Sequence, residues 1–296
     1  MPISLADDAQ LRELVMHRLA TRVTQSGGFL VRAELSDFDL GDGTRRRLID
    51  TSKGIWNPRD LNATLSIVSS PDGPYDDHEV DGGLFRYDYR AGSVEGDNTK
   101  LRRAKELDLS LILLRKINNA YVPIFPVFVI DDDLERRQFV IAVDEALRIL
   151  ARPTELSPLE RRYAEQITRR RLHQAMFRGM VVRAYEVRCA VCRLRHGDLL
   201  DAAHITADSE EAGLAIVTNG LSLCKIHHAA YDRQLLGITS DYRVAINRAL
   251  LDEIDGPMLK HGLQEMHGET IQLPTRSAEH PDRERLAARY ELFVAS

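Results

Sequence analysis

The sequence lacks several features that would place it quickly in a broad class of protein. It has three cysteines in 296 residues, too few and odd in number for a disulfide framework. It has no apolar run of the length that a bilayer requires. Its first residues form no signal peptide but an amphipathic helical pattern that stops at Gly27 and Gly28. These absences argue against a membrane or secreted protein, and a cytoplasmic location is expected.

An excess of positive charge is also missing. The formal net charge is −5 and the pI is about 6.1, which excludes a uniformly basic nucleic-acid binder. A local basic patch is still possible, because local charge decides phosphate binding. After the break ARPTELSP, the helical segment 159–188 carries eight arginines against three glutamates. This segment is interpreted either as a solvated helix face or as a phosphate contact.

The length predicts two domains, since 296 residues exceed what one core usually holds. After the first helix, several β-rich runs are separated by Gly, Pro, Asp and Asn. Their spacing predicts a curved sheet or barrel. We place the boundary near 152, which gives an α+β protein with domains 1–151 and 152–296. The β-rich runs are 63–70, 84–90, 107–117, 121–130 and 137–143.

All three cysteines lie in one short region. CAVC (189–192) offers two thiolates, and CKIH (224–227) offers a thiolate and an imidazole one helical turn apart. Cys-x2-Cys followed by Cys-x2-His matches the four tetrahedral ligands of a structural zinc site. The alternative is that the cysteines are small buried hydrophobic residues. The predicted zinc ligands are Cys189, Cys192, Cys224 and His227.

A second histidine directly follows the first in NGLSLCKIHHAAYD (219–232). On a helix, His228 lies about 100° round from His227 and shares its face with Asp232, four residues on. We therefore predict one helix with two metal sites on two faces, and Asn219 as its N-cap. Upstream, the short apolar strand LLDAAHI (199–205) contains His204 and is expected to form a β-hairpin between the two zinc half-sites.

His204, Asn219 and His228, framed by CxxC and CxxH, resemble an HNH (ββα-metal) nuclease. The resemblance implies that His204 is the general base that deprotonates the water attacking a phosphodiester. It implies that Asn219 pins the local loop and so orients His204. It also implies that His228 and Asp232 hold one divalent ion, which is Mg²⁺, Mn²⁺ or a similar ion.

The chain departs from the family at one position. Members often have a metal-binding Asp or His immediately before the base, where this chain has Ala203. Asp201 is the nearest carboxylate and is a further candidate ligand. Ideal strand alternation places Asp201 on the face opposite His204, so a bulge or twist would have to bring it in.

The first half contains SSPDGPYDDHEVDGGLFRYDYR (69–90), in which Phe85, Tyr87 and Tyr89 share one face of a strand. Periodicity alone favours a core stripe of aromatic residues. The loop before the strand is rich in Gly, Pro and Asp, and Tyr75 within it is in an unusual place for a core residue.

This stretch resembles the SRA domain, a PUA-like curved β-barrel with flanking helices that flips modified cytosine out of the duplex. The resemblance implies that Tyr75 and Tyr87 sandwich the base and that Asp77 or Asp76 accepts its amino hydrogen. Strict counting places the family's aspartate on His78, so a local shift is needed. Further residues that could meet phosphates are Arg59, Lys100, Arg102 and Arg103.

The order of the two modules resembles SRA–HNH modification-dependent restriction endonucleases over nearly the whole chain. That layout implies cleavage of double-stranded DNA containing 5-methylcytosine or 5-hydroxymethylcytosine, by a homodimer or by two independent nicks. Three alternatives stay open. The chain could be a non-catalytic reader of modified DNA with a zinc-stapled module. It could be a nuclease whose first domain recognises another feature, such as phosphorothioate. It could also be an RNA nuclease with a PUA-like RNA binder.

Overall fold

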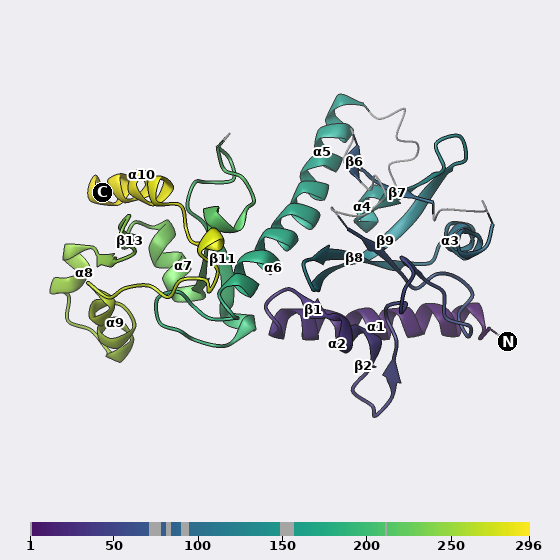
Figure 1. Ribbon diagram of the computed structural model, residues 1–296, viewed down its shortest axis with the longest axis horizontal. Coiled ribbons are helices and arrows are strands. Elements are labelled where there is room, and N and C mark those ends of the chain that lie inside the picture. Colours follow the sequence, from purple (N-terminus) through teal and green to yellow (C-terminus); the bar gives the residue numbers. More distant parts are fainter. Residues whose placement is uncertain (1, 71–77, 81–83, 90–94, 149–156, 211) are drawn as a thin grey trace. The chain divides into compact units, whose positions relative to one another are not determined.

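The computed structural model describes residues 2–70, 78–80, 84–89, 95–148, 157–210 and 212–296 (Figure 1). The chain forms two compact units. The first comprises Met1–Val23 and Phe29–Ala175, and the second comprises Thr24–Gly28 and Met176–Ser296. The domain bounds expected from the sequence, 1–151 and 152–296, stay a prediction, because a compact unit need not coincide with a segment that folds by itself.

The first unit combines helices with one mixed sheet, and its elements follow in chain order. The helices are α1 (Leu5–Gln25), α2 (Arg32–Ser36), α3 (Asp97–Glu106), α4 (Glu145–Arg148), α5 (Pro158–Thr168) and the π-helical η1 (Arg169–Gln174). The strands are β1 (Leu30–Val31), β2 (Phe38–Asp39), β3 (Arg45–Arg46), β4 (Ile55–Trp56), β5 (Ser66–Ser69), β6 (His78–Val80), β7 (Leu84–Asp88), β8 (Leu111–Ile117), β9 (Ala120–Asp133) and β10 (Gln138–Ala142).

The long strand β9 connects the two arms of the curved sheet. The strand order is β4-β5-β8-β9-β10-β7-β6, with β1 also paired to β9. The first part of β9 pairs with β8, and its last part pairs with β10. Only β5 and β8 run parallel among these pairs of described strands. Four consecutive buried residues open β8, as expected for a strand that is covered on both faces.

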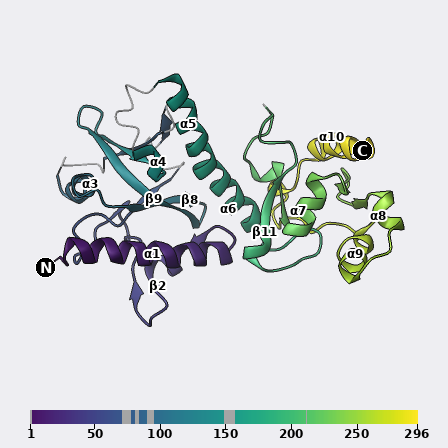
Figure 2. The ribbon, with the colours of Figure 1, turned by 180° about the vertical axis from the view of Figure 1, so that it is seen from behind.

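Helix α1 packs against the sheet, as Figures 1 and 2 show from opposite sides. Val15 and Leu19 of α1 are fully buried in a cluster that includes Ile112 of β8. Arg12 is also buried; its guanidinium pairs with Asp8 at 2.7 Å and donates to three backbone carbonyls. These bonds satisfy a charge that would otherwise be costly to bury, and they anchor α1 to the loops around the sheet.

The secondary structure of the first unit follows the sequence closely. The β-rich runs correspond to β5, β7, β8, β9 and β10, and the first helix ends two residues before Gly27. The α+β class and the curved sheet predicted from the sequence are therefore confirmed. None of the helices in the described part of the chain has the length and apolar character needed to cross a bilayer.

The second unit holds short elements around a small core. Its helices are α6 (Ala175–Ala184), η2 (Gly197–Leu199), η3 (Val217–Asn219), α7 (Lys225–Asp232), α8 (Arg248–Asp252), α9 (Pro257–Gly262), η4 (Gln264–Met266), η5 (Ser277–Glu279) and α10 (Arg283–Val294). Its strands are β11 (Leu200–His204), β12 (Gly220–Cys224), β13 (Leu236–Ile238) and β14 (Val244–Ile246).

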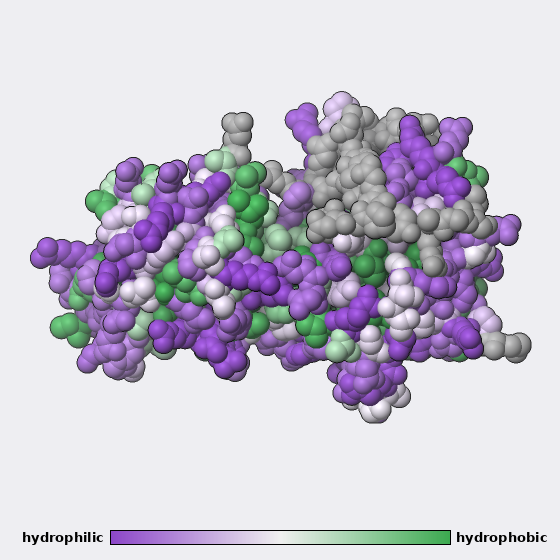
Figure 3. All heavy atoms as spheres, in the orientation of Figure 1, coloured by the Kyte–Doolittle hydropathy of each residue, from purple (hydrophilic) through white to green (hydrophobic). Residues whose placement is uncertain are grey.

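The core of this unit joins α6, the β11–β12 hairpin and α7. Phe177, Leu221 and Tyr231 belong to it, together with Cys189 and Cys224. Polar side chains cover most of the face of the unit that Figure 3 displays. Cys189 and Cys224 lie inside the apolar core, where the negative charge of a thiolate must be stabilised by a hydrogen bond, an opposite charge or a metal ion.

The strip Thr24–Gly28 completes the second unit from a distant part of the sequence. Gly197 packs so closely on it that a Cβ atom there would lie 2.1 Å from the carbonyl oxygen of Gln25. Only glycine allows the two backbones to approach in this way. The end of α1 thus has a structural role in a unit whose other residues begin at Met176.

The helix predicted from Asn219 begins later than expected. Residues 220–224 form strand β12, which pairs with β11 in antiparallel register, and α7 starts only at Lys225. The prediction of Asn219 as a helix cap is therefore wrong. The physical reason is that GLSLC is a short, wholly buried apolar run, and periodicity cannot distinguish such a strand from a helical turn. The predicted hairpin between the zinc half-sites is confirmed.

Candidate metal centre and active site

Three cysteines and one histidine converge in the second unit. One ligand atom from each of Cys189, Cys192, Cys224 and His227 lies within 4.8 Å of the others. The Nδ1 atom of His227 is 3.1 Å from Cys224 Sγ and 3.4 Å from Cys189 Sγ. The Sγ atoms of Cys192 and Cys224 are 4.0 Å apart. Zinc–sulfur bonds of about 2.3 Å in a tetrahedron require sulfur separations of about 3.8 Å, so the cluster fits zinc.

The surroundings of His227 also fit a ligand. Its Nε2 atom donates to the carbonyl oxygen of Gly262 at 2.7 Å, and the ring is 2% exposed. This bond selects the tautomer in which Nδ1 faces the thiols. Hydrogen bonds from Cys189 and Cys192 hold the pKa of Cys224 far below its ordinary value. Cys224 is therefore held as a thiolate, the form that binds zinc, while hydrogen bonds with Cys192 and Cys224 raise the pKa of Cys189, whose proton zinc binding would release.

The β11–β12 hairpin positions the next three candidates. Asn219 is fully buried directly before β12. Its side-chain oxygen accepts from the Thr206 amide at 2.8 Å, and its nitrogen donates to the carbonyls of Thr206 at 3.1 Å and Leu214 at 2.9 Å. Asn219 thus ties down the chain just after His204, which is a loop-pinning geometry rather than a helix cap.

His204 ends strand β11 and is partly exposed. Its imidazole stacks on the ring of Phe177 from α6, with ring centroids 3.8 Å apart and planes inclined by 15°. In the register of the hairpin, His204 lies opposite Gly220. The base candidate is therefore held at the end of a regular strand, with one ring face covered.

His228 lies on α7 between two carboxylates. Its Nδ1 atom is 3.4 Å from Asp201 Oδ2, and its Nε2 atom is 3.4 Å from Asp232 Oδ2. The two aspartates therefore contact opposite edges of the imidazole. Asp201 also receives both of its short contacts of 2.6 Å from the Lys225 ammonium. Asp201, on strand β11, thus lies close to His228, as a ligand role would require. However, it contacts the Nδ1 edge of the imidazole, whereas Asp232 contacts the Nε2 edge.

The charges at this site reinforce one another. The hydrogen bond from His228 and the contacts with Lys225 lower the pKa of Asp201 to about 2, although burial acts in the opposite direction. The same hydrogen bond raises the pKa of His228 above its ordinary 6.5. The Asp201 carboxylate therefore stays ionised at neutral pH, where it can accept a hydrogen bond from Nδ1.

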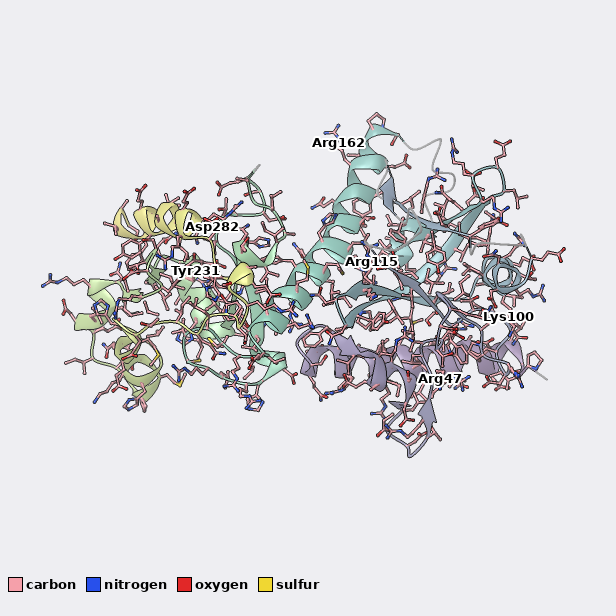
Figure 4. All side chains as sticks on the ribbon, in the orientation of Figure 1. Arg47, Lys100, Arg115, Arg162, Tyr231 and Asp282 are labelled. Carbon is pink, nitrogen blue, oxygen red and sulfur yellow. The ribbon has the colours of Figure 1, made fainter. Side chains whose placement is uncertain are left out.

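Two further residues were not found from the sequence. Arg289 of α10 places its guanidinium over the ring of Tyr231 at 5.0 Å, and its Nη2 atom is 4.0 Å from Asp232 Oδ1. Figure 4 shows Tyr231 within the second unit, and Asp282, which caps α10 by accepting from the amides of Glu284 and Arg285. The second residue that was not found from the sequence is Phe177, whose ring stacks on the His204 imidazole. No spacing rule connects either residue with the motif, because both contacts are tertiary.

Part of the predicted base pocket lies outside the described residues. Tyr75, Asp76 and Asp77 fall there. Tyr87 is described: it is 5% exposed, lies on β7 and donates its hydroxyl to the Gly54 carbonyl at 3.2 Å. Tyr89 is also buried and packs against Phe139, with ring centroids 4.7 Å apart and planes inclined by 35°. The described part of this strand therefore packs as a core stripe.

Several basic residues of the first unit are engaged within the protein. Lys100, labelled in Figure 4, donates to the carbonyls of Pro58 at 2.7 Å and Leu61 at 2.9 Å. Burial lowers the pKa of Lys100. Arg102 pairs with Asp132, and Arg103 pairs with Glu106 at 2.8 Å. Arg59 is exposed. The predicted phosphate contacts of these residues stay a prediction.

Arginines of the basic segment likewise hold backbone in place. Arg171 donates to the carbonyls of Val143 and Phe125, and Arg178 donates to those of Gly197 and Leu200. The Arg178 guanidinium also lies 4.0 Å from Asp201. These two arginines have a structural role, so the solvated-face interpretation does not describe them.

Comparison with known families identifies the metal region. Residues 189–239 match the HNH endonuclease family. The matched segment begins at the first zinc-ligand candidate, includes His204, Asn219, His228 and Asp232, and ends just after β13. The second unit therefore contains an HNH endonuclease segment, and the prediction of a nuclease from the motif is confirmed.

Solved structures show weaker similarities. The modification-dependent TagI restriction endonuclease is 16% identical over 90% of this chain and 92% of its own, with a TM-score of 0.32. The SRA domain of SUVH5 in complex with hemi-methylated CG DNA is 22% identical over 38% of this chain and 82% of its own, with a TM-score of 0.28. The phosphorothioation-dependent restriction endonuclease ScoMcrA is 15% identical over 62% of this chain and 51% of its own, with a TM-score of 0.24. No curated protein matches the chain.

Proposed function

We propose that this chain is a modification-dependent restriction endonuclease. Its first unit recognises modified cytosine in double-stranded DNA, and its second unit hydrolyses a phosphodiester bond. The proposal depends above all on the β11–β12–α7 arrangement, in which a pinned histidine, a buried asparagine and a histidine between carboxylates fall within one HNH segment. The Cys3His cluster beside it supplies rigidity rather than chemistry, since four protein ligands leave no open position.

In the proposed reaction His204 is the general base. It accepts a proton from water, whose oxygen attacks phosphorus while the bond to the 3′-oxygen breaks. Asn219 keeps the backbone beside His204 fixed through both of its hydrogen bonds to Thr206. Positioning of this kind contributes to rate because the reacting atoms must meet within narrow limits of distance and angle.

His228 and Asp232 would hold a divalent ion, which stabilises negative charge on the phosphate and on the leaving oxygen. Imidazole and carboxylate suit such an ion, and they lie 3.4 Å apart. In this proposal Asp201 accepts a hydrogen bond from Nδ1 of His228 and so directs Nε2 toward Asp232. A direct ligand role for Asp201, which is a further candidate from the sequence, would require its carboxylate to move to the other edge of the imidazole.

The modified-base function of the first unit rests on the sequence resemblance to SRA domains. The curved sheet supports it, because such a sheet is the expected scaffold, and Tyr87 lies on it. Flipping would place the cytosine between Tyr75 and Tyr87, with Asp77 or Asp76 at its amino group, and it requires one face of the buried Tyr87 ring to be uncovered. One HNH site nicks one strand, so a double-strand break requires a homodimer or two independent nicks.

A cleavage assay on matched plasmids tests this function. We expect cutting of the 5-methylcytosine or 5-hydroxymethylcytosine plasmid in Mg²⁺ or Mn²⁺, and at least tenfold slower cutting of the unmodified plasmid. The physical reason is that recognition of the flipped base raises the local concentration of DNA at the nuclease. Tyr75→Ala should reduce this preference, because one stacking surface for the base is lost.

The controls separate the alternatives. Equal cutting of all plasmids would keep the nuclease but contradict the modified-cytosine function. Preferential cutting of phosphorothioate plasmid would favour the alternative in which the first unit recognises that modification. Binding of modified DNA without cutting of any plasmid by folded protein would favour a non-catalytic reader.

The proposed ion site also predicts a pH dependence. A protonated His228 cannot bind a metal, and the Asp201 hydrogen bond raises its pKa above 6.5. Affinity for Mn²⁺ should therefore rise with pH by up to about tenfold per unit, and level off above the raised pKa. Titration calorimetry at several pH values between 6 and 9 measures this. His261→Ala, which removes an exposed histidine on α9, is the control and should leave the curve unchanged. A flat curve would contradict a ligand role for His228.

A further inference from the structure

The covered face of His204 has a well-defined partner. Phe177 of α6 is 2% exposed, and its ring lies nearly parallel to the imidazole at a centroid distance of 3.8 Å. The ring nitrogens lie at the edges of the imidazole, so the stack covers a face and not a nitrogen, and Nε2 is buried. This arrangement suits a group that must be held in place and still accept a proton.

A glycine makes this stack possible. Gly220 lies opposite His204 in the hairpin. A Cβ atom there would be 2.4 Å from Cγ2 of Val181, and 3.0 and 3.1 Å from Cζ and Cε2 of Phe177. Contacts below 3.0 Å cannot be tolerated without movement of the neighbours, so any side chain at this position would displace α6 side chains. Because position 220 has no side chain, the Phe177 ring can pack directly against this end of the hairpin.

The two restraints on His204 act on different degrees of freedom. Strand pairing and the Asn219 hydrogen bonds to Thr206 fix the main chain on either side of the residue. Neither fixes the rotation of the imidazole about its last side-chain bond, which is a broad torsion. The flat ring of Phe177 restricts that rotation. An aromatic face also favours a cation beside it, which is the form that His204 takes on accepting a proton.

We propose that Phe177 is a positioning residue for His204, holding the imidazole plane in the orientation needed for proton transfer. This inference rests on the proposed role of His204 as general base. It extends the active site to α6, which lies before the first zinc-ligand cysteine in the sequence and outside the segment 189–239.

The test compares two core substitutions on the same helix in the full zinc-loaded protein. Phe177→Leu removes the ring but keeps an apolar side chain, whereas Val181→Ala removes packing beside Gly220 and leaves the Phe177 ring in place. We expect Phe177→Leu to lower kcat on modified plasmid about tenfold to a hundredfold, with KM changed less than about twofold. Val181→Ala should change kcat less than about threefold. Phe177→Met is made in parallel, because methionine fills irregular space and protects against a folding failure.

A spectroscopic measurement gives a readout independent of turnover. The ring current of Phe177 should shift the His204 ring-proton signals upfield in the wild-type protein. That shift should vanish in Phe177→Leu and Phe177→Met and persist in Val181→Ala. The His204 signals are identified by their loss in His204→Ala.

The outcomes are distinguishable. If His204→Ala cuts as fast as the wild type, the proposed function fails. If His204→Ala is inactive but Phe177→Leu and Phe177→Met keep the wild-type kcat, the positioning role is overturned. Equal losses of kcat in Phe177→Leu and Val181→Ala would also overturn it, because packing alone would then explain the effect.

Discussion

Substituting His227 by alanine is expected to cost the protein its zinc and to unfold its second unit, whereas the same substitution at His228 is not. His227 contacts two thiols and is buried, while His228 faces two carboxylates. Structural zinc in small domains contributes about 10–16 kcal/mol of apparent binding free energy, so its loss exceeds the stability of a unit this small. Without the ion, the Cys224 thiolate would remain buried in an apolar core.

Three measurements check this contrast between adjacent residues. Mass spectrometry should find one zinc per chain in the wild type and in His228→Ala, and much less in His227→Ala. Amide hydrogen exchange should show loss of protection in residues 176–296 of His227→Ala, with the sheet of the first unit still protected. A chelator should have the same effect on the wild type. Full protection in a zinc-free His227→Ala protein would mean that the cluster is not structural.

The second large effect is expected from His204→Ala. A general base contributes about 10²–10⁴-fold to rate, so we expect cleavage of modified plasmid to fall at least about a hundredfold. His204 is partly exposed but stacks on the buried Phe177, so its removal should lower the melting temperature by about 2–5 °C and leave the protein folded. Affinity for modified DNA should be unchanged, since the proposed recognition resides in the first unit.

His196→Ala is the matched control for this experiment, because His196 is an exposed histidine shortly before β11. Its cleavage rate should equal that of the wild type. Loss of DNA affinity in His204→Ala, with the cleavage rate at saturating DNA preserved, would show that His204 binds substrate and that the base lies elsewhere. Rates are therefore measured both below and above saturation.

Local spacing was sufficient to predict the Cys3His cluster. The two ligands of each half-site, CAVC (189–192) and CKIH (224–227), lie close together because they are three residues apart in the sequence. The β11–β12 hairpin then only has to bring the two half-sites together. The assignment of His227 and His228 to different faces followed from helix geometry for the same reason. These features depend on neighbours in the sequence, which is why they needed no knowledge of tertiary packing.

Tertiary contacts explain what sequence reasoning missed. Strand alternation placed Asp201 away from His204, which left it doubtful as a neighbour of the site, yet α7 packs on the hairpin so that Asp201 meets His228. Arg289 reaches Asp232 from a helix near the end of the chain. Phe177 reaches His204 only because position 220 has no side chain. In each case the partner is chosen by packing, which leaves no period or motif in the sequence.

The strip Thr24–Gly28 affects how this nuclease could be moved between proteins. Because Gly197 packs against its backbone, the second unit is assembled from two separated pieces of chain. If only a C-terminal piece that begins after residue 28 were fused to another protein, the strip Thr24–Gly28 would be missing. The backbone around Gly197, which this strip covers, would then be exposed. Exchange by recombination must therefore carry both pieces together, which ties the inheritance of the nuclease to the first helix of the protein.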